Sequence, residues 1–425
     1  MISRSGVAIH NRLHSIVRQL TPPTQPVDRR LDAFSSNRFQ LHSSLLHSSS
    51  RSSAPVSLTK YFTKMSNQAI QTPATIDLRQ LLSVCYELSQ HAGESIRRIF
   101  DSGNLGAIDK DPSHPQSASS PGQFGNINDP QTLADLESQR VIIGNLIRLY
   151  GPDLKIVGEE GELDNCTGSD LLYREARKDL FEKEQFPEEL TKLDTKDITV
   201  WIDPLDGTKE FTLGFVHYVT VLIGISYRNR AIGGVVHVPF IGGDYVQRHD
   251  PLNPTHRPPP KQAKPGKTIW GAVGFGVRGS ELADLSTIPN SRRFITTTRS
   301  HFSDKLKSVL DTLKPEAIIR CGGAGSKGLL VLSGDADAYL YPQTGTKRWD
   351  TAAIDALIKA AGGTFTDQYG DEIVYDANLP PENTTGLLGT MRDHQLYLLP
   401  KPNSNSTHSS SLQPKAEPHN KAAAL

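Results

Sequence analysis

Apolar residues recur at helical spacing in two segments of the first half of the chain, Leu78 to Ile99 and Leu133 to Leu149. Side chains three and four positions apart share one face of a helix, so this pattern predicts two amphipathic helices. Short β-branched runs follow, namely KIVG, TVWI, VTVLIGISY and AIGGVVHVP. The last two runs flank the polar turn RNR, which predicts a β-hairpin.

The pattern changes after about residue 290, where strand-like and helical segments alternate. Their order is FITTT, a helix over Ser303 to Leu313, AIIRC, a helix after Ser326, DAYLY and a helix over Asp350 to Ala361. Alternating strands and helices are typical of an α/β architecture. The sequence therefore predicts an α+β domain over residues 65–247, followed by an α/β domain over residues 248–400.

The two ends of the chain lack such a pattern, and we expect them to lie outside the fold. Residues 1–64 carry seven arginines, two acidic residues and a serine-rich block. This composition predicts either a mitochondrial transit peptide or a plain disordered extension, and it lacks the apolar segment of a secretory signal. Residues 401–425 are rich in Ser, Pro and Asn and are expected to form a disordered tail. The polar stretches 113–126 and 251–267 predict loop insertions.

Composition narrows the class of partner. The 425 residues include 46 basic and 46 acidic ones, so no net charge favours binding to a nucleic-acid polymer or an anionic membrane. Cys85, Cys166 and Cys321 are odd in number and far apart, which argues against a disulfide framework and against a zinc site. No stretch approaches the ~18 consecutive apolar residues of a membrane span. We therefore expect an intracellular protein, in the cytoplasm or in mitochondria, that is not secreted.

The segment WIDPLDGTKEF places Asp203 and Asp206 at the end of an apolar strand. At ~4 Å two such charges repel by about 1 kcal/mol in water and by roughly 4 kcal/mol at the dielectric near a protein surface. A bound cation would offset this repulsion. Taken alone, DPLDG is also compatible with an ordinary turn, because Asp, Pro and Gly are the usual turn residues.

Other acidic residues occupy comparable positions. Glu159 and Glu160 follow the strand KIVG, Asp135 lies at the head of a helix in QTLAD, and Asp350 opens a helix in RWDTAA. Each alone is more often a helix cap or a solvated surface residue. Strand ends and helix starts are, however, where an α/β architecture gathers its active site. The set as a whole therefore favours an acidic, cation-binding site.

These motifs carry a resemblance to a known family. WIDPLDGTKEF, with VGEE upstream and WDTAA downstream, resembles the inositol monophosphatase family of magnesium-dependent, lithium-sensitive phosphomonoesterases, which includes fructose bisphosphatase. The flanking motifs GTKEFT, VTVLIGISY, TIWG, ITTTRSH and GGAGSK are most similar to those of family members that act on bisphosphate nucleotides. The resemblance covers about residues 70–395. It implies a layered αβαβα sandwich of combined α+β and α/β character.

The resemblance also implies a metal centre. Its ligands would be Glu159, Asp203, the backbone carbonyl of Leu205, Asp206 and Asp350, and they would hold two or three Mg²⁺ ions, with Asp203 bridging two of them. Hard oxygen ligands, few of them from the protein, are what Mg²⁺ requires. The first of the two predicted domains would thus be the metal-binding, catalytic one.

The reacting end of the site is expected at Asp135 and Thr208, which the resemblance implies activate the attacking water together. The backbone N–H groups of Gly207 and Thr208 would meet phosphate oxygens. Water would then attack the phosphoester directly and in line, without a phosphoenzyme. The alternative for Thr208 is an ordinary helix cap.

The second domain would bind the nucleotide. The resemblance assigns nucleotide contacts to Thr298 and His301 in ITTTRSH and to Gly323 and Lys327 in GGAGSK. A compact lysine ammonium suits a phosphate, and a glycine lets the backbone approach a ligand. The bland alternatives are a capping histidine near Ser303 and a solvated lysine at a helix start.

The implied reaction removes the 3′-phosphate of 3′-phosphoadenosine 5′-phosphate and yields AMP and phosphate. An inositol polyphosphate 1-phosphatase shares the acidic set and is the enzymatic alternative. A catalytically silent nucleotide-binding protein would be expected to lack a ligand or the threonine, whereas all six side chains are present here: Asp135, Glu159, Asp203, Asp206, Thr208 and Asp350. Related proteins carry a lysine where this chain has Leu133, and they lack the insertion before Asn128. We expect this departure to alter lithium sensitivity and the affinity for the most weakly held magnesium.

Overall fold

The structure is a computed structural model that describes residues 71–110, 117–118, 129–161, 178–181, 185–241 and 266–401. The leader, nearly all of the C-terminal tail, most of both expected insertions and Cys166 lie outside the described residues. Within those residues, no helix combines the length and the apolar character needed to cross a membrane.

Two long helices form the first layer, as the apolar spacing predicts. They are α3 (Leu78–Ser102) and α4 (Leu133–Tyr150), and they pack against each other. The carboxylate of Asp77 accepts the backbone N–H of Arg79 at the start of α3, and Gly103, with a φ of 74°, ends it. A left-handed residue at this position is most easily supplied by glycine.

A six-stranded sheet forms the second layer. In spatial order its strands are β11 (Gly276–Arg278), β10 (Lys267–Ala272), β9 (Arg230–Val238), β8 (Thr220–Tyr227), β7 (Ile198–Asp206) and β5 (Lys155–Gly158). Strands β5 and β7 are parallel, and the other neighbours are antiparallel. The predicted β8–β9 hairpin is confirmed, and its turn residues Arg228 and Asn229 both have a positive φ, which matches the strand twist.

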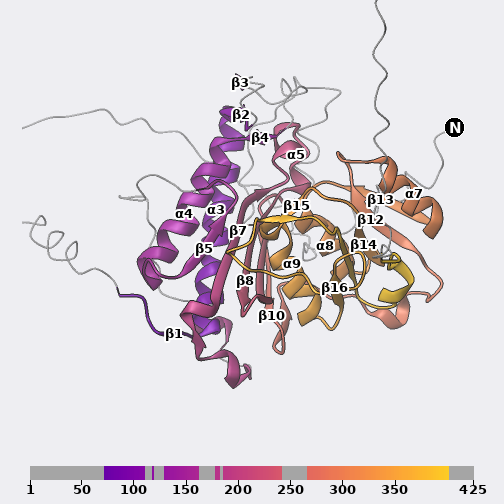
Figure 1. Cartoon of the computed structure of the whole chain (residues 1–425). Helices are drawn as coiled ribbons and strands as arrows, with labels where there is room; N and C mark the ends of the chain where they lie inside the picture. The colour runs from indigo at the N-terminus through magenta and orange to yellow at the C-terminus, as the bar shows by residue number, and fades with distance from the viewer. Residues whose placement is uncertain are drawn as a thin grey trace, which may run out of the picture.

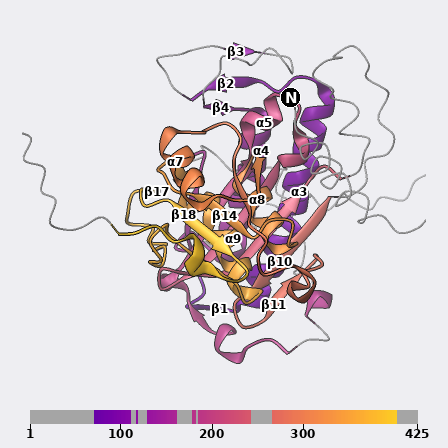
Figure 2. The ribbon, with the colours of Figure 1, turned by 90° about the vertical axis from the view of Figure 1, so that its right-hand side faces the viewer.

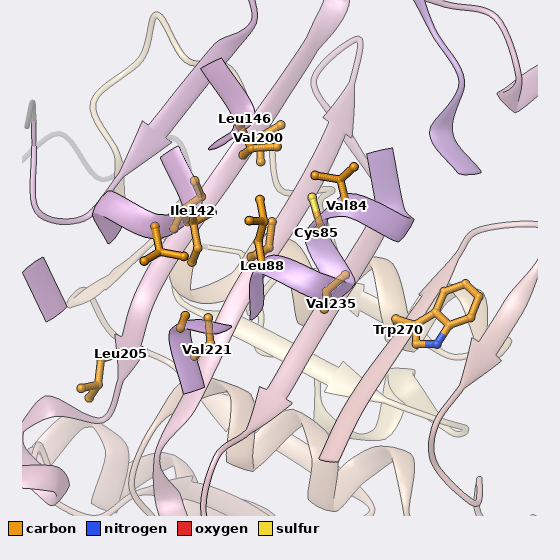
Figure 3. Close-up of a cluster of buried hydrophobic side chains, with 14 of the residues drawn as sticks. Val84, Cys85, Leu88, Ile142, Leu146, Val200, Leu205, Val221, Val235 and Trp270 are labelled. Carbon is orange, nitrogen blue, oxygen red and sulfur yellow. The ribbon is translucent and has the colours of Figure 1, made fainter. Parts of the chain in front are cut away.

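Helices α3 and α4 cover one face of this sheet. Leu88 of α3 and Ile142 of α4 pack with Val200, Val221 and Val235 of the sheet in one apolar core (Figure 3).

Helices α8 (Ala324–Leu332) and α9 (Arg348–Ala360) cover the opposite face. Two glycines let α9 approach the sheet closely. A Cβ added to Gly224 would lie 2.4 Å from the Cβ of Ala352, and one added to Gly234 would lie 2.3 Å from the carbonyl oxygen of Ala353. Any larger residue at either strand position would therefore push α9 away.

A second sheet lies beyond α8 and α9. Its order is β13 (Ala317–Cys321), β12 (Phe294–Thr298), β14 (Ala338–Tyr341), β18 (Leu387–Thr390) and β16 (Thr364–Thr366), with the first three strands parallel. Helix α7 (Asp304–Leu313) packs on its outer face through Leu306 and Leu310. The layers run α3/α4, sheet, α8/α9, sheet, α7 (Figure 1), which confirms the predicted αβαβα sandwich.

Shorter elements complete the fold. Near the amino end of the described chain, β1 (Thr75–Ile76) pairs with β6 (Leu193–Asp194). A small sheet of β2 (Ala107–Asp109), β3 (Ser117–Ala118) and β4 (Pro130–Gln131) lies beside the one-turn helix α5 (Thr208–Thr212) (Figure 2). Strand β15 (Thr346–Lys347), which directly precedes α9, pairs with β17 (Glu382–Asn383), which follows α9 in the chain.

The two sheets do not divide where the sequence predicts a domain boundary. Strands β10 and β11 follow residue 248, yet they pair with β9 in the first sheet. The chain changes sheets only after Arg278. The short run TIWG does not indicate which sheet it joins, because its partner strand lies in the preceding segment. The division at 247/248 therefore remains a prediction about folding units and does not describe the sheets.

Candidate active site

The carboxyl ends of β5 and β7 bring three acidic residues together. The two strands are parallel, and the backbone N–H of Glu159, just after β5, donates to the carbonyl of Ile202 at 3.1 Å. This bond sets Glu159 beside Asp203. The ladder between β7 and β8 is irregular between Asp203 and Asp206, so the strand bends where the two aspartates lie.

Asp350 reaches the same region from α9. Its Oδ2 accepts the backbone N–H of Lys347 at 2.7 Å, as a capping residue does. Burial raises the pKa of Asp203 well above its usual value, and the nearby charges of Glu159, Asp206 and Asp350 raise it further. The pKa of Asp350 rises for the same reasons, burial first and then the charge of Glu159. Such mutual repulsion is what a bound cation would relieve.

Asp206 has a second set of partners. Its Oδ1 accepts the backbone N–H of Ala324, and its Oδ2 accepts that of Gly325, both at 2.7 Å. The hydroxyl of Thr220 also donates to Oδ2, at 2.7 Å. Asp206 thus ties the end of β7 to the start of α8.

The acidic side chains do not form a finished coordination sphere. Within the described ranges, no three His, Cys, Asp or Glu side chains are arranged as ligands of one metal ion. Several of the carboxylate oxygens are engaged by hydrogen-bond donors of the protein instead. Oxygen donors of this kind, gathered in one place, have the chemistry that suits Mg²⁺. The metal-ligand assignment for Glu159, Asp203, Leu205, Asp206 and Asp350 therefore stays a prediction.

Lys110 is a charged neighbour that the sequence did not reveal. Its ammonium donates to Glu159 Oε1 at 2.7 Å and to Glu160 Oε1 at 2.8 Å. Burial lowers the pKa of Lys110, but the two carboxylates outweigh burial and the net shift is upward. Lys110 follows β2, far from the acidic motif in sequence, and a lone lysine after a three-residue strand has no recognisable pattern.

Asp135 and Thr208 are in direct contact. The hydroxyl of Thr208 lies 2.9 Å from Oδ1 of Asp135 and 2.9 Å from the carbonyl oxygen of Leu205, and it can donate to one of them at a time. The other oxygen of Asp135 accepts the backbone N–H of Thr132 at 2.8 Å. Burial raises the pKa of Asp135 to about 7, with Glu160 as the next cause. Asp135 thus completes the capping box of α4 and also contacts Thr208.

The turn before α5 explains why Thr208 is free for this contact. Gly207 occupies the cap position with a φ of 88°, and its conformation is one that side chains disfavour. Because Thr208 lies inside the helix and turns its hydroxyl toward Asp135 and Leu205, the reading of Thr208 as an ordinary cap is wrong.

Gly323 and Lys327 lie at the start of α8. Gly323 has a φ of 65°, and a Cβ there would lie 2.7 Å from Oδ2 of Asp206, so only glycine fits. Lys327 is 6% exposed, and its ammonium donates to the carbonyls of Gly323 and Cys321. The reading of Lys327 as a solvated lysine is therefore wrong. Helix α8 also begins at Ala324, three residues before the start predicted after Ser326.

His301 lies in a compact loop that begins at Thr298, the last residue of β12. The hydroxyl of Thr298 accepts the backbone N–H of His301 at 3.1 Å. Ser303, not His301, caps α7, because its hydroxyl accepts the N–H of Leu306. Burial lowers the pKa of the His301 imidazole, and the positive charges of Lys209 and Lys327 lower it further. The positive charges of Lys209 and Lys327 thus lie near His301, and these three residues are called the positive side of the site below.

Comparison with known proteins agrees with this arrangement. The model of the inositol monophosphatase family matches residues 77–397. The chain is 38% identical over 331 residues to 3′(2′),5′-bisphosphate nucleotidase 1 of Dictyostelium discoideum, which covers 76% of this chain and 96% of that protein. It is 34% identical to the human protein of the same name, over 75% of this chain and 93% of the relative. Putative inositol monophosphatase 3 of Drosophila melanogaster is 30% identical, over 77% of this chain and 82% of the relative.

The chain therefore belongs to the inositol monophosphatase family, whose members are generally metal-dependent phosphatases.

Proposed function

We propose that the chain is a magnesium-dependent phosphatase that removes the 3′-phosphate of a bisphosphate nucleotide, with 3′-phosphoadenosine 5′-phosphate as the reference substrate and AMP and phosphate as products. The two relatives with the higher identities reported above are named as nucleotidases of this kind. The observation that carries the proposal is the contact of Thr208 with Asp135 beside the carboxylates of Asp203 and Asp206, which are buried, and those of Glu159 and Asp350, which are partly buried.

Glu159, Asp203, Asp206 and Asp350, with the carbonyl of Leu205, would hold the metal ions. Bound Mg²⁺ would supply positive charge for the transferring phosphoryl group and would acidify a water molecule. Lys110, whose single positive charge is shared between Glu159 and Glu160, would offset one of their two negative charges and leave Glu159 and the three aspartates for the metal ions. The donor set fits hard divalent ions by its chemistry, since all its members are oxygens.

Asp135 and Thr208 would direct the proton of the attacking water. When Thr208 donates its hydroxyl proton to Oδ1 of Asp135, its oxygen lone pairs face away from that carboxylate and can accept a proton from water. The contact of Asp135 Oδ2 with Thr132 fixes the orientation of the carboxylate. A carboxylate with a pKa near neutrality suits a proton acceptor that works at neutral pH.

The positive side of the site would bind the nucleotide. Lys327 and His301 would approach the phosphate that does not react, while Thr298 and Gly323 would leave room for the sugar and base. The backbone N–H groups of Gly207 and Thr208 would face the reacting phosphate. An inositol polyphosphate 1-phosphatase remains the alternative, because it would use the same acidic cluster.

Phosphate release from a panel of substrates tests the proposal. The full-length chain is incubated with 3′-phosphoadenosine 5′-phosphate, adenosine 3′-monophosphate or inositol 1,4-bisphosphate, with Mg²⁺ or with EDTA. We expect Mg²⁺-dependent release that is fastest from the bisphosphate nucleotide, with AMP as the nucleotide product. Faster release from the inositol bisphosphate would favour the alternative, and release that persists in EDTA would contradict the metal centre.

A further inference from the structure

Glu210 is a buried acidic residue next to the site that none of the proposed roles uses. It lies on α5, two residues after Thr208, and is 3% exposed. A buried carboxylate requires compensation by a cation or by hydrogen bonds. Among the described residues, its Oε1 has no hydrogen-bond partner.

The predicted nucleotide loop brings a cation within ion-pair distance of Glu210. The Nε of Arg299 lies 3.6 Å from Oε1 of Glu210, and within the described part of the chain Nε also lacks a hydrogen-bond partner. Arg299 stands between Thr298 and His301 in sequence. The guanidinium lies over the ring of Phe215, 4.2 Å from its centre, and the backbone N–H of Phe215 donates to the carbonyl of Glu210 at 2.8 Å. Glu210, Phe215 and Arg299 thus form a closed set of contacts.

The start of α8 is built around the same carboxylate. A Cβ added to Gly322 would lie 2.4 Å from both Cγ and Cδ of Glu210, so only a glycine leaves room for this side chain. The carbonyls on either side of Gly322, those of Cys321 and Gly323, accept from Lys327. The backbone at Gly322 therefore leaves a space that the side chain of Glu210 fills.

Several contacts hold the loop that contains Arg299. His301 bonds back to Thr298 within the loop, and the guanidinium of Arg320 donates to the carbonyl of Arg299 at 2.8 Å. The side-chain amide of Gln343 donates to the carbonyl of His301 at 2.9 Å, and Arg299 pairs with Glu210. Of these contacts, the pair with Glu210 alone reaches α5, the element that carries Thr208.

We propose that Glu210 is a positioning residue that acts through Arg299: it sets the distance between the nucleotide-binding loop and the catalytic turn at Thr208. This inference rests on the proposed function. A substrate with two phosphates needs both ends of the site at a fixed separation, so the pair would serve substrate binding and not the chemical step. Arg299, being held by Glu210, is not the residue that reads the second phosphate.

The test combines steady-state kinetics with hydrogen exchange. Glu210→Gln and Arg299→Gln, singly and together, are assayed with 3′-phosphoadenosine 5′-phosphate, and exchange of the His301 amide is followed in the substrate-free, full-length protein. We expect KM to rise on the order of tenfold in each single variant with a much smaller change in kcat, and no further rise in the double variant. The His301 amide should exchange faster in each variant than in the wild type.

Asp337→Asn is the matched control. Asp337 forms a buried ion pair with Arg292 at the opposite end of β12, with Nε and Nη2 of Arg292 each 2.9 Å from a carboxylate oxygen. Loss of this ion pair should lower the free energy of unfolding. It should leave KM and the exchange rate of the His301 amide unchanged. A fall in kcat with unchanged KM, additive effects in the double variant, or an unchanged His301 amide would overturn the proposal. If the wild type does not hydrolyse the nucleotide, the proposed function fails, and the exchange measurement still decides whether Glu210 holds the loop.

Discussion

Asp206 accepts the backbone N–H of Ala324 at 2.7 Å, so a predicted metal ligand also fastens the first turn of α8. Because of this bond, we expect substitutions of Asp203 and Asp206 to change the stability of the protein in different ways. Asp203→Asn and Asp206→Asn should both abolish Mg²⁺-dependent phosphate release. Asn at 206 would turn an amide N–H₂ toward the backbone donors of Ala324 or Gly325, which costs about 1–3 kcal/mol of unfolding free energy.

Asp203→Asn should instead raise the stability of the metal-free protein, because it removes one of several mutually repelling buried charges. Urea unfolding in EDTA distinguishes the two variants, and phosphate release with Mg²⁺ measures activity. Near-normal release by either variant would exclude it as an essential ligand. Equal stability of the two would contradict the role of Asp206 at α8.

Removing the hydroxyl of Thr208 should slow the chemical step. In Thr208→Ala we expect kcat to fall on the order of a hundredfold or more, while the Mg²⁺ concentration that gives half-maximal activity stays the same. Thr208→Ser keeps a hydroxyl within reach of Asp135 and is the control, with an expected loss of less than about tenfold. An increase in KM alone would show that Thr208 binds substrate and does not direct the proton.

Lys327 should distinguish substrates by their second phosphate. In Lys327→Met the value of kcat/KM for 3′-phosphoadenosine 5′-phosphate should fall about ten- to a hundredfold, since a charge-assisted hydrogen bond is worth roughly 1.5–3 kcal/mol. The value for adenosine 3′-monophosphate should change far less. Lys307→Met, at an exposed lysine on α7, is the control for loss of a positive charge. An unchanged ratio between the two substrates would remove Lys327 from recognition of the second phosphate.

His237 should make the fold sensitive to mild acid. It is buried on β9, with Nδ1 2.8 Å from the hydroxyl of Thr268, and burial lowers its pKa to about 3. The unfolded chain, in which a histidine has a pKa near 6.5, binds the additional proton. Stability from this group is therefore complete above about pH 6.5 and declines toward pH 3, by roughly 2 kcal/mol at pH 5.

Urea unfolding of the wild type and of His237→Asn between pH 7 and pH 5 measures this effect. Asn can keep the hydrogen bond to Thr268 but does not titrate, so its stability should depend less steeply on pH. Parallel pH curves for the two proteins would rule out His237 as the cause.

The elements around the site were predictable where a local pattern specified them. The β-branched run before Asp203 and the run before Glu159 became neighbouring parallel strands, and RNR became a hairpin turn whose residues adopt the required positive φ. The acidic residues that follow these strands also lie near one another in the structure, while their role as metal ligands stays a prediction. Asp135 and Asp350 also stabilise helix starts, since each accepts the backbone N–H of the N-cap residue three positions earlier. In Asp135 the other oxygen contacts Thr208, so the capping role and the predicted role in the site use different oxygens of one carboxylate.

The remaining features depend on contacts between distant segments. The pairing of Lys110 with Glu159 and Glu160, and that of Arg299 with Glu210, join residues that no periodicity relates. Burial of Lys327 follows from the loop folded around its ammonium, which the helical pattern does not indicate. The place of β10 in the first sheet is decided by its ladder with β9. Each of these is set by tertiary structure, so sequence reasoning could reach it only through the family resemblance.

The glycines that seat α9 also affect how the protein is made. Gly224 and Gly234 lie on a sheet face that α9 covers, and α9 leaves the ribosome long after β9 has been synthesised. Until then the nascent first sheet presents an apolar, unpaired surface to the cell, and exposed surfaces of this kind promote aggregation. The amino-terminal half is therefore expected to depend on chaperones during translation. A pause in synthesis before residue 348 would lengthen the time during which this sheet face stays exposed.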